Sequence, residues 1–158
     1  MQGIFKKEDI GFDIRNLITL SIEIMINVAF DNSNKVDVKF DQSFPTDVTG
    51  DMGKLKNAMI SLNYALFKHA KNTTVDIYCH FDEALTSNRC MLSFEYSFIS
   101  ADHDINIFLT MLTNGATEQQ FFKLGIDECI SSILFHQLGA AIEHNIDTIT
   151  YKIQLKIK

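Results

Sequence analysis

One segment, residues 47–70, constrains the fold of this 158-residue chain more than any other. It reads DVTGDMGKLKNAMISLNYALFKHA, and it turns from a short strand around Val48 into a long helix after Gly50 and Asp51. Apolar residues recur in this helix at intervals of three and four, which places them on one face. They are Leu55, Ala58, Met59, Leu62 and Leu66. A helix of this kind must pack that face against a second layer, so we expect a layered domain.

Hydrophobic periodicity predicts the other elements. We expect helices at residues 13–32, 104–112 and 126–138, with Asp13 as the first N-cap and Gly139 ending the last helix. We expect strands at residues 36–40, 75–81, 90–99 and 148–158, with a turn at 82–89. Clustered strands with few crossovers favour a two-layer α/β sandwich of the α+β class, in which helices cover one face of a mixed, mostly antiparallel sheet.

Composition narrows the classes of partner. Hydrophobic residues make up 46% and charged residues 22%, which is typical of one folded domain, here residues 1–158. The net charge of −6 disfavours nucleic acid and anionic membranes as partners. The apolar run at residues 17–30 is too short and too polar to be embedded in a membrane. The three cysteines lack metal or redox spacing. We expect a cytoplasmic module of a longer protein, which could include a membrane anchor elsewhere.

The segment at residues 47–70 resembles the opening of the ATP-binding domain of histidine kinases and their GHKL (Bergerat-fold) relatives, V-x-x-D-x-x-R-L-x-Q-V-L-x-N-L-L-x-N-A-x-K-[FH]-[TS]. The resemblance implies the same two-layer fold. It also implies that the second asparagine of the pattern holds the magnesium ion that bridges the ATP phosphates. The two asparagine positions are Ser61 and Ala65 in this chain. Asn63 is no replacement, because it lies about 200° around the helix from Ala65.

The second nucleotide motif of that family, F-x-V-x-D-x-G-x-G, resembles the end of MLSFEYSFIS and the residues after it. The resemblance assigns Phe98 to the aspartate that accepts the adenine amino group, and Ser100 and Asp102 to the two glycines. A phenylalanine cannot accept a hydrogen bond from an amino group, and we expect Phe98 to fill the adenine space instead. We expect Asp102 to be a solvated loop acid.

The third motif precedes the last helix, where KLGIDECISSILFHQLGAAI resembles G-L-G-L-A-I-S-K-x-L-V-x-x-M-G-G-x-I. Gly125 matches the first loop glycine, and Asp127 replaces the second, with Glu128 next to it. Two carboxylates complement the dipole at a helix N-terminus. They also repel the phosphates that this loop binds in the family.

The substitutions in these three motifs predict a catalytically inactive histidine kinase-like domain, a pseudokinase, with no catalytic residue, cofactor or metal and no ATP binding. We expect a protein-interaction and regulatory module of a two-component phosphorelay, whose partner is a histidine-containing hairpin, a phosphotransfer domain, a receiver domain or a true kinase. A second apolar ridge on the first helix, formed by Leu20, Ile24 and Val28, is the expected interaction surface. Two alternatives remain open: a divergent but active ATP-binding kinase domain, and a structural module that forms a homodimer.

Overall fold

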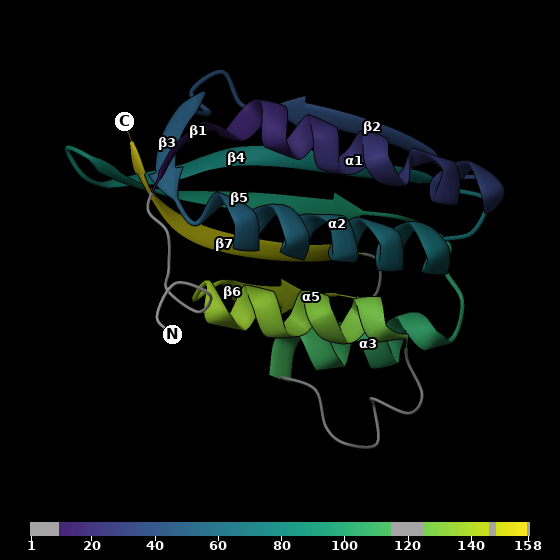
Figure 1. Ribbon diagram of the computed structural model, residues 1–158. Helices are drawn as coiled ribbons and strands as arrows, with labels where there is room; N and C mark the ends of the chain where they lie inside the picture. Colours follow the sequence, from purple (N-terminus) through teal and green to yellow (C-terminus); the bar gives the residue numbers. More distant parts are fainter. Residues whose placement is uncertain (1–9, 115–124, 146–147, 158) are drawn as a thin grey trace.

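The computed structural model describes residues 10–114, 125–145 and 148–157. Within them, seven strands form one sheet, and Figure 1 shows α1, α2 and α5 side by side across one face, with α3 next to α5. The strands are β1 (Ile10–Asp13), β2 (Lys35–Phe40), β3 (Asp47–Gly50), β4 (Thr74–Thr86), β5 (Arg89–Ser97), β6 (Ala141–His144) and β7 (Thr148–Ile157). The helices are α1 (Ile14–Asp31), α2 (Met52–His69), α3 (Asp104–Asn114) and α5 (Ile126–Gln137).

The strand order is β1-β3-β7-β5-β4-β2, and β6 pairs with the part of β7 that β3 leaves free. Strands β2 and β4 run parallel, and every other neighbouring pair in this described sheet is antiparallel. The mixed, mostly antiparallel sheet with helices on one face confirms the predicted fold class. Among the described helices, none has the length and apolar character needed to cross a membrane.

Both long helices begin where side-chain chemistry predicts. The Asp13 carboxylate accepts a hydrogen bond from the backbone N–H of Asn16 at 2.9 Å, which caps α1. Asp51 accepts one from the N–H of Lys54 at 3.1 Å and caps α2. Gly139 follows α5 with φ of 71°, the left-handed conformation that favours glycine after a helix.

One local prediction was wrong, and two strands were missed. No residue range was predicted for β1 and β6, which are four residues long and show no clear alternation of apolar and polar residues. Most of the predicted turn at residues 82–89 is strand, since β4 continues to Thr86 and β5 begins at Arg89. The side chains at the end of β4 are exposed, and the pairing has register shifts between Phe81 and Glu83 and between Ala84 and Thr86. Bulges of this kind remove the period-two pattern that marks a strand.

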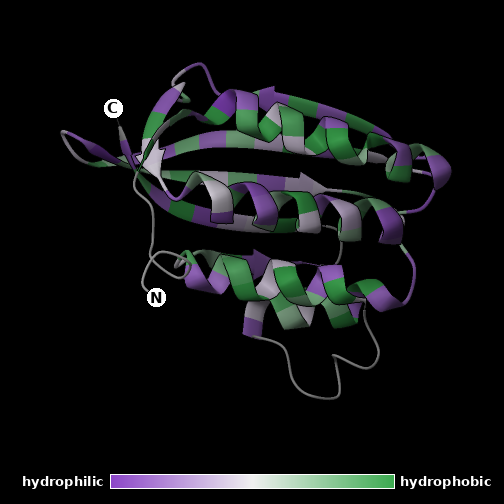
Figure 2. Cartoon of the chain, in the orientation of Figure 1, coloured by the Kyte–Doolittle hydropathy of each residue, from purple (hydrophilic) through white to green (hydrophobic). Residues whose placement is uncertain are grey.

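The core lies between the helices and the covered face of the sheet. Val75, Ile77 and Cys79 of β4 are buried and alternate with exposed residues, and Figure 2 shows the corresponding mixture of hydrophobic and hydrophilic positions along strands and helices. Tyr151 of β7 is the centre of an aromatic group, with its ring centroid 4.8 Å from that of Phe94 and 4.5 Å from that of Phe135. These contacts tie α5 to the middle of the sheet.

A buried asparagine at the end of the helical layer provides the first test of the fold. The Asn34 side chain donates to the carbonyl oxygens of Phe67 and Ala70 and accepts from the N–H of Thr73, and it is 2% exposed. We expect Asn34→Ala to lower the free energy of unfolding by about 2–4 kcal/mol, because it leaves buried backbone groups unpaired. Urea unfolding measures the change. Asn16→Ala, at an exposed position, is the control and should change it by less than about 0.5 kcal/mol; equal effects would contradict the assignment.

Candidate functional site

The two asparagine positions of the first motif carry small side chains that face the core of the domain. Ala65 is fully buried, and Ser61 is 6% exposed. Asn63 is fully buried and structural: its amide donates to Ser21 Oγ of α1 at 3.3 Å, and its oxygen accepts from the Tyr96 hydroxyl of β5 at 2.6 Å. Asn63 therefore ties α2 to α1 and β5, on a different side of the helix from Ala65.

The segment after β5 is fastened to the C-terminal end of α2 by its backbone. The N–H of Asp102 donates to the His69 carbonyl at 2.8 Å, and the Ser100 carbonyl accepts from the N–H of Lys71 at 2.9 Å. Phe98, which we expected in the adenine space, is 3% exposed and belongs to the hydrophobic core. The segment of the second motif that contains Ser100 and Asp102 is thus hydrogen-bonded to the end of α2.

Asp102 is not the solvated loop acid that the sequence predicted. Its two carboxylate oxygens lie 2.8 and 3.0 Å from His69 Nδ1, and its side chain is 34% exposed. The prediction was wrong because the backbone hydrogen bond to α2 brings Asp102 next to a histidine that is 33 positions away in the chain. The His69 ring also stacks on Phe108 of α3, with 6.0 Å between ring centroids.

Glu128, in the first turn of α5, completes the cluster from the other side. Its side chain is fully buried, and its Oε1 atom accepts a hydrogen bond from Lys68 Nζ and lies 3.3 Å from His69 Nε2. Lys68, His69, Asp102 and Glu128 together form what we term the ion-pair cluster. The cluster joins α2, α5 and the segment before α3, and its polar side chains lie at the place where the first and third motifs meet.

Gly125 has a specific role in this arrangement. A Cβ atom added at Gly125 would lie 2.7 Å from Glu128 Oε2 and 3.6 Å from Lys68 Nζ. Because glycine has no side chain, the Glu128 carboxylate can occupy the space next to Gly125. The loop glycine that matches the family motif accommodates an internal carboxylate in this chain.

The electrostatics of the cluster favour the ionised form of Glu128. Burial alone would raise the pKa of its carboxyl, but the nearby His69 and Lys68 side chains outweigh burial and lower the pKa to about 2. Lys68 is 34% exposed, and its ammonium group also lies 5.3 Å from the centre of the Tyr64 ring. The carboxylate is thus a fixed negative charge that neutralises the cationic end of α2.

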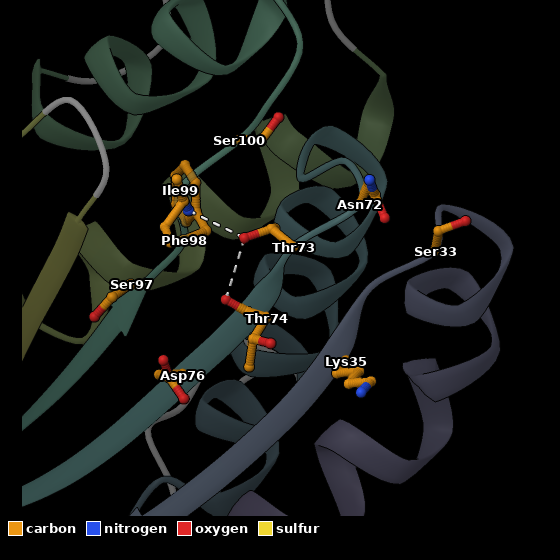
Figure 3. Close-up of a pocket in the computed structure, with 10 residues that line it drawn as sticks. All are labelled: Ser33, Lys35, Asn72, Thr73, Thr74, Asp76, Ser97, Phe98, Ile99 and Ser100. Carbon is orange, nitrogen blue, oxygen red and sulfur yellow. Dashed lines mark hydrogen bonds between the residues drawn. The ribbon is translucent and has the colours of Figure 1, made fainter.

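Helices α2 and α5 are also in contact nearer the middle of α5, where Ser131 Oγ donates to the Ala58 carbonyl at 3.4 Å. Asp127, the residue at the second glycine position, is part of the first turn of α5 and is half-buried. A pocket of about 470 Å³ lies elsewhere, at the ends of β2, β4 and β5 (Figure 3). Its lining includes Phe98 and Ser100 together with Lys35, and it includes no residue of α2 or α5.

The structure therefore separates the predicted positions into two groups. Asp102, Gly125 and Asp127 lie at or beside the ion-pair cluster, whereas Phe98 and Ser100 border the pocket of Figure 3. Lys68, His69 and Glu128 were not predicted as site residues. The one available signal was chemical: α2 ends with Lys68 and His69, and α5 begins with Asp127 and Glu128.

Comparison with known proteins identifies the fold. No family model matches the sequence, and no curated protein matches it. The solved histidine kinase AdeS of Acinetobacter baumannii matches with a TM-score of 0.62 at 13% identity, over 98% of this chain and 70% of AdeS. The catalytic domain of histidine kinase ThkA matches with a TM-score of 0.61 at 15% identity, over 95% of this chain and 97% of that domain.

Two complexes are also similar to this chain. Full-length ShkA with AMPPNP has a TM-score of 0.60 at 18% identity, and the match spans 97% of this chain and 31% of ShkA. ThkA with the response regulator protein TrrA has a TM-score of 0.59 at 15% identity, over 96% of this chain and 42% of the matched chain. The domain thus has the fold of histidine kinase catalytic domains, the GHKL-type ATPase fold that the sequence resembles.

The depressed pKa of Glu128 predicts a specific acid sensitivity. The pKa falls from an ordinary value of 4.5 to about 2 on folding, so the unfolded chain takes up the proton first as pH falls. The stability that this carboxylate contributes is present above about pH 4.5 and is lost towards pH 2, with a total of about 3 kcal/mol. Urea unfolding of the wild type and of Glu128→Gln across this range measures it.

We expect the wild type to lose about 3 kcal/mol more than Glu128→Gln over that range. Glu143→Gln, which changes an exposed carboxylate of β6, controls for general acid denaturation. Parallel pH profiles for the wild type and Glu128→Gln would show that the cluster does not hold Glu128 ionised.

Proposed function

We propose that this domain is a catalytically inactive, histidine kinase-like module that does not bind ATP and that acts through protein contacts in a two-component phosphorelay. The ion-pair cluster carries this proposal. It places a buried, ionised carboxylate beside the lysine at the end of α2, where the first and third nucleotide motifs converge. Cytoplasmic location and the absence of enzyme activity are parts of the same proposal.

A nucleotide would meet two obstacles at this site. Glu128 already neutralises Lys68, and a polyphosphate would have to displace a buried carboxylate or share the space with it, which like charges resist. The position of the magnesium ligand carries no polar atom either, because Ala65 is buried among apolar residues. Both obstacles act on the phosphates and the metal, the parts of Mg-ATP that depend most on electrostatic contacts.

The surface of α1 supports a role in protein interaction. Leu20 is 40% exposed and Ile24 is 48% exposed, while Val28, the third member of the predicted ridge, is half-buried and packs against the core. The interaction surface that we propose is therefore centred on Leu20 and Ile24. ThkA, which shares the fold, has been solved with a response regulator. We propose a phosphorelay protein as the partner here: a hairpin, a phosphotransfer domain, a receiver domain or a kinase.

We predict that Mg-ATP does not bind at concentrations up to about 1 mM. A ligand at ten times its Kd would stabilise the fold by about 1.4 kcal/mol, so thermal unfolding detects binding as well as calorimetry does. We expect neither heat nor a shift in Tm with Mg-ATP or Mg-AMPPNP, measured against magnesium alone. A saturable response below about 1 mM would overturn the proposal and favour a divergent, active kinase domain.

We predict that Leu20→Asp with Ile24→Asp weakens binding to a phosphorelay partner at least about tenfold, because two charges replace apolar contact area. The free energy of unfolding should change by less than about 1 kcal/mol, since both side chains are already in contact with solvent. Partner binding by calorimetry and urea unfolding provide the two measurements. Ile18→Asp, at a fully buried position of the same helix, should unfold the domain. Unfolding of the double variant would place the ridge in the core.

A further inference from the structure

Strand β2 forms one border of the sheet, and its outer backbone edge pairs with no other strand of the described residues. In the described sheet it pairs with β4 alone, and Figure 1 shows it along the outer border beneath α1. The N–H of Lys35 donates to Thr73 and that of Asp41 donates to Cys79, so odd-numbered residues direct their backbone groups towards β4. The N–H and carbonyl groups of Val36, Val38 and Phe40 therefore point away from the sheet, where another strand can pair with them.

The side chains of β2 carry an unbalanced charge pattern on the other face of the sheet. Lys35, Asp37 and Lys39 are exposed, and none of them has an ion-pair partner in the described part of the chain. Asp37 lies directly beside Asp76 of β4 in the parallel register. Adjacent like charges on one face of a sheet are destabilising. A lysine arriving from outside the border would relieve this repulsion.

We propose that β2 pairs antiparallel with β2 of a second copy of this chain, about a two-fold axis at Val38. Asp37 then lies opposite the partner's Lys39, and Lys39 opposite the partner's Asp37. Val36 lies opposite the partner's Phe40, and Lys35 opposite the partner's Asp41. Asp37 and Lys39 thus each face an opposite charge, and every apolar side chain of the strand faces an apolar one. The Asp41 carboxylate contributes less, because it already accepts a hydrogen bond from the N–H of Phe81 in its own chain.

Charge selects this register from the few that the backbone allows. A register shifted by one residue is excluded. It would place the outward-facing backbone groups of even-numbered residues opposite odd-numbered residues, whose groups already bond to β4. Centring the axis on Asp37 instead would place Asp37 opposite the partner's Asp37 and Lys35 opposite the partner's Lys39. The charges of Asp37 and Lys39 disfavour pairing of β2 with strands that lack a matching pattern, and they are complementary to those of a second copy of β2.

Helix α1 adds apolar surface near this border. The guanidinium group of Arg15 donates to the carbonyls of Asp41 and Phe44, so the side of α1 that bears Arg15 faces the end of β2. Phe30 lies about 60° around the helix from Arg15 and is 60% exposed. A second copy brings its own α1 to the same face of the joined sheet, where Phe30 is available for contact.

Two single substitutions and their mixture test the pairing. Lys39→Asp places acids opposite Asp37, and Asp37→Lys places lysines opposite Lys39, so each variant alone should dimerise at least about tenfold more weakly than the wild type. In an equimolar mixture, lysines at positions 37 and 39 of one strand lie opposite aspartates at positions 39 and 37 of the other, so both of these opposed pairs are complementary. We expect the mixture to dimerise as tightly as the wild type. Sedimentation equilibrium up to about 1 mM protein measures all four samples.

Lys54→Asp in the first turn of α2 is the matched control, because it makes the same change in net charge as Lys39→Asp away from β2 and should leave the dimer unchanged. Circular dichroism confirms that each variant is folded. A wild type that stays monomeric throughout, single variants that dimerise as tightly as the wild type, or a mixture that stays monomeric would each overturn the proposal.

Discussion

The buried carboxylate of Glu128 is the constraint on which the arrangement of the helical layer depends. A fully buried charge is stable only where partners compensate for its lost hydration, and here Lys68 and His69 of α2 do so. The compensation works only while the start of α5 lies against the end of α2. His69 in turn binds Asp102, which fixes the segment that leads into α3. Removing one partner would leave a buried charge uncompensated, a change that costs about 3–5 kcal/mol in fully buried pairs.

The same constraint bears on our proposal that the domain binds no nucleotide. A phosphate site needs cations and backbone donors that have no partner in the absence of ligand. Repulsion between such unpaired cations destabilises the ligand-free protein. In this chain Glu128 supplies the negative charge internally, and Gly125 leaves room for it. Phe98 and Ala65 add apolar volume to the core. Internal charge pairs and buried apolar side chains contribute to stability without any ligand, which agrees with the role that we propose.

The sequence predicted those features that depend on local chemistry. Helix periodicity and side-chain caps located α1 and α2, and alternation located the central strands. Strands β1 and β6 were missed because four residues carry little periodic signal. The ion-pair cluster was missed for another reason: Lys68 and Glu128 are 60 positions apart, and no local pattern relates them. Read locally, Glu128 is a helix-capping acid; its burial follows only from the packing of α5 on α2.

Charge has two different functions at two places in this domain. In the ion-pair cluster, Lys68 pairs with Glu128 and His69 contacts Asp102, so the contacts are made within the chain. Along β2, the charges find no such partner in the described residues, and Asp37 lies beside another acid. Uncompensated charge on an ordered strand is tolerated because it is solvated, and it favours any partner that neutralises it. Specificity can thus reside at the surface of this fold, where the pattern of Lys35, Asp37 and Lys39 distinguishes one strand from another.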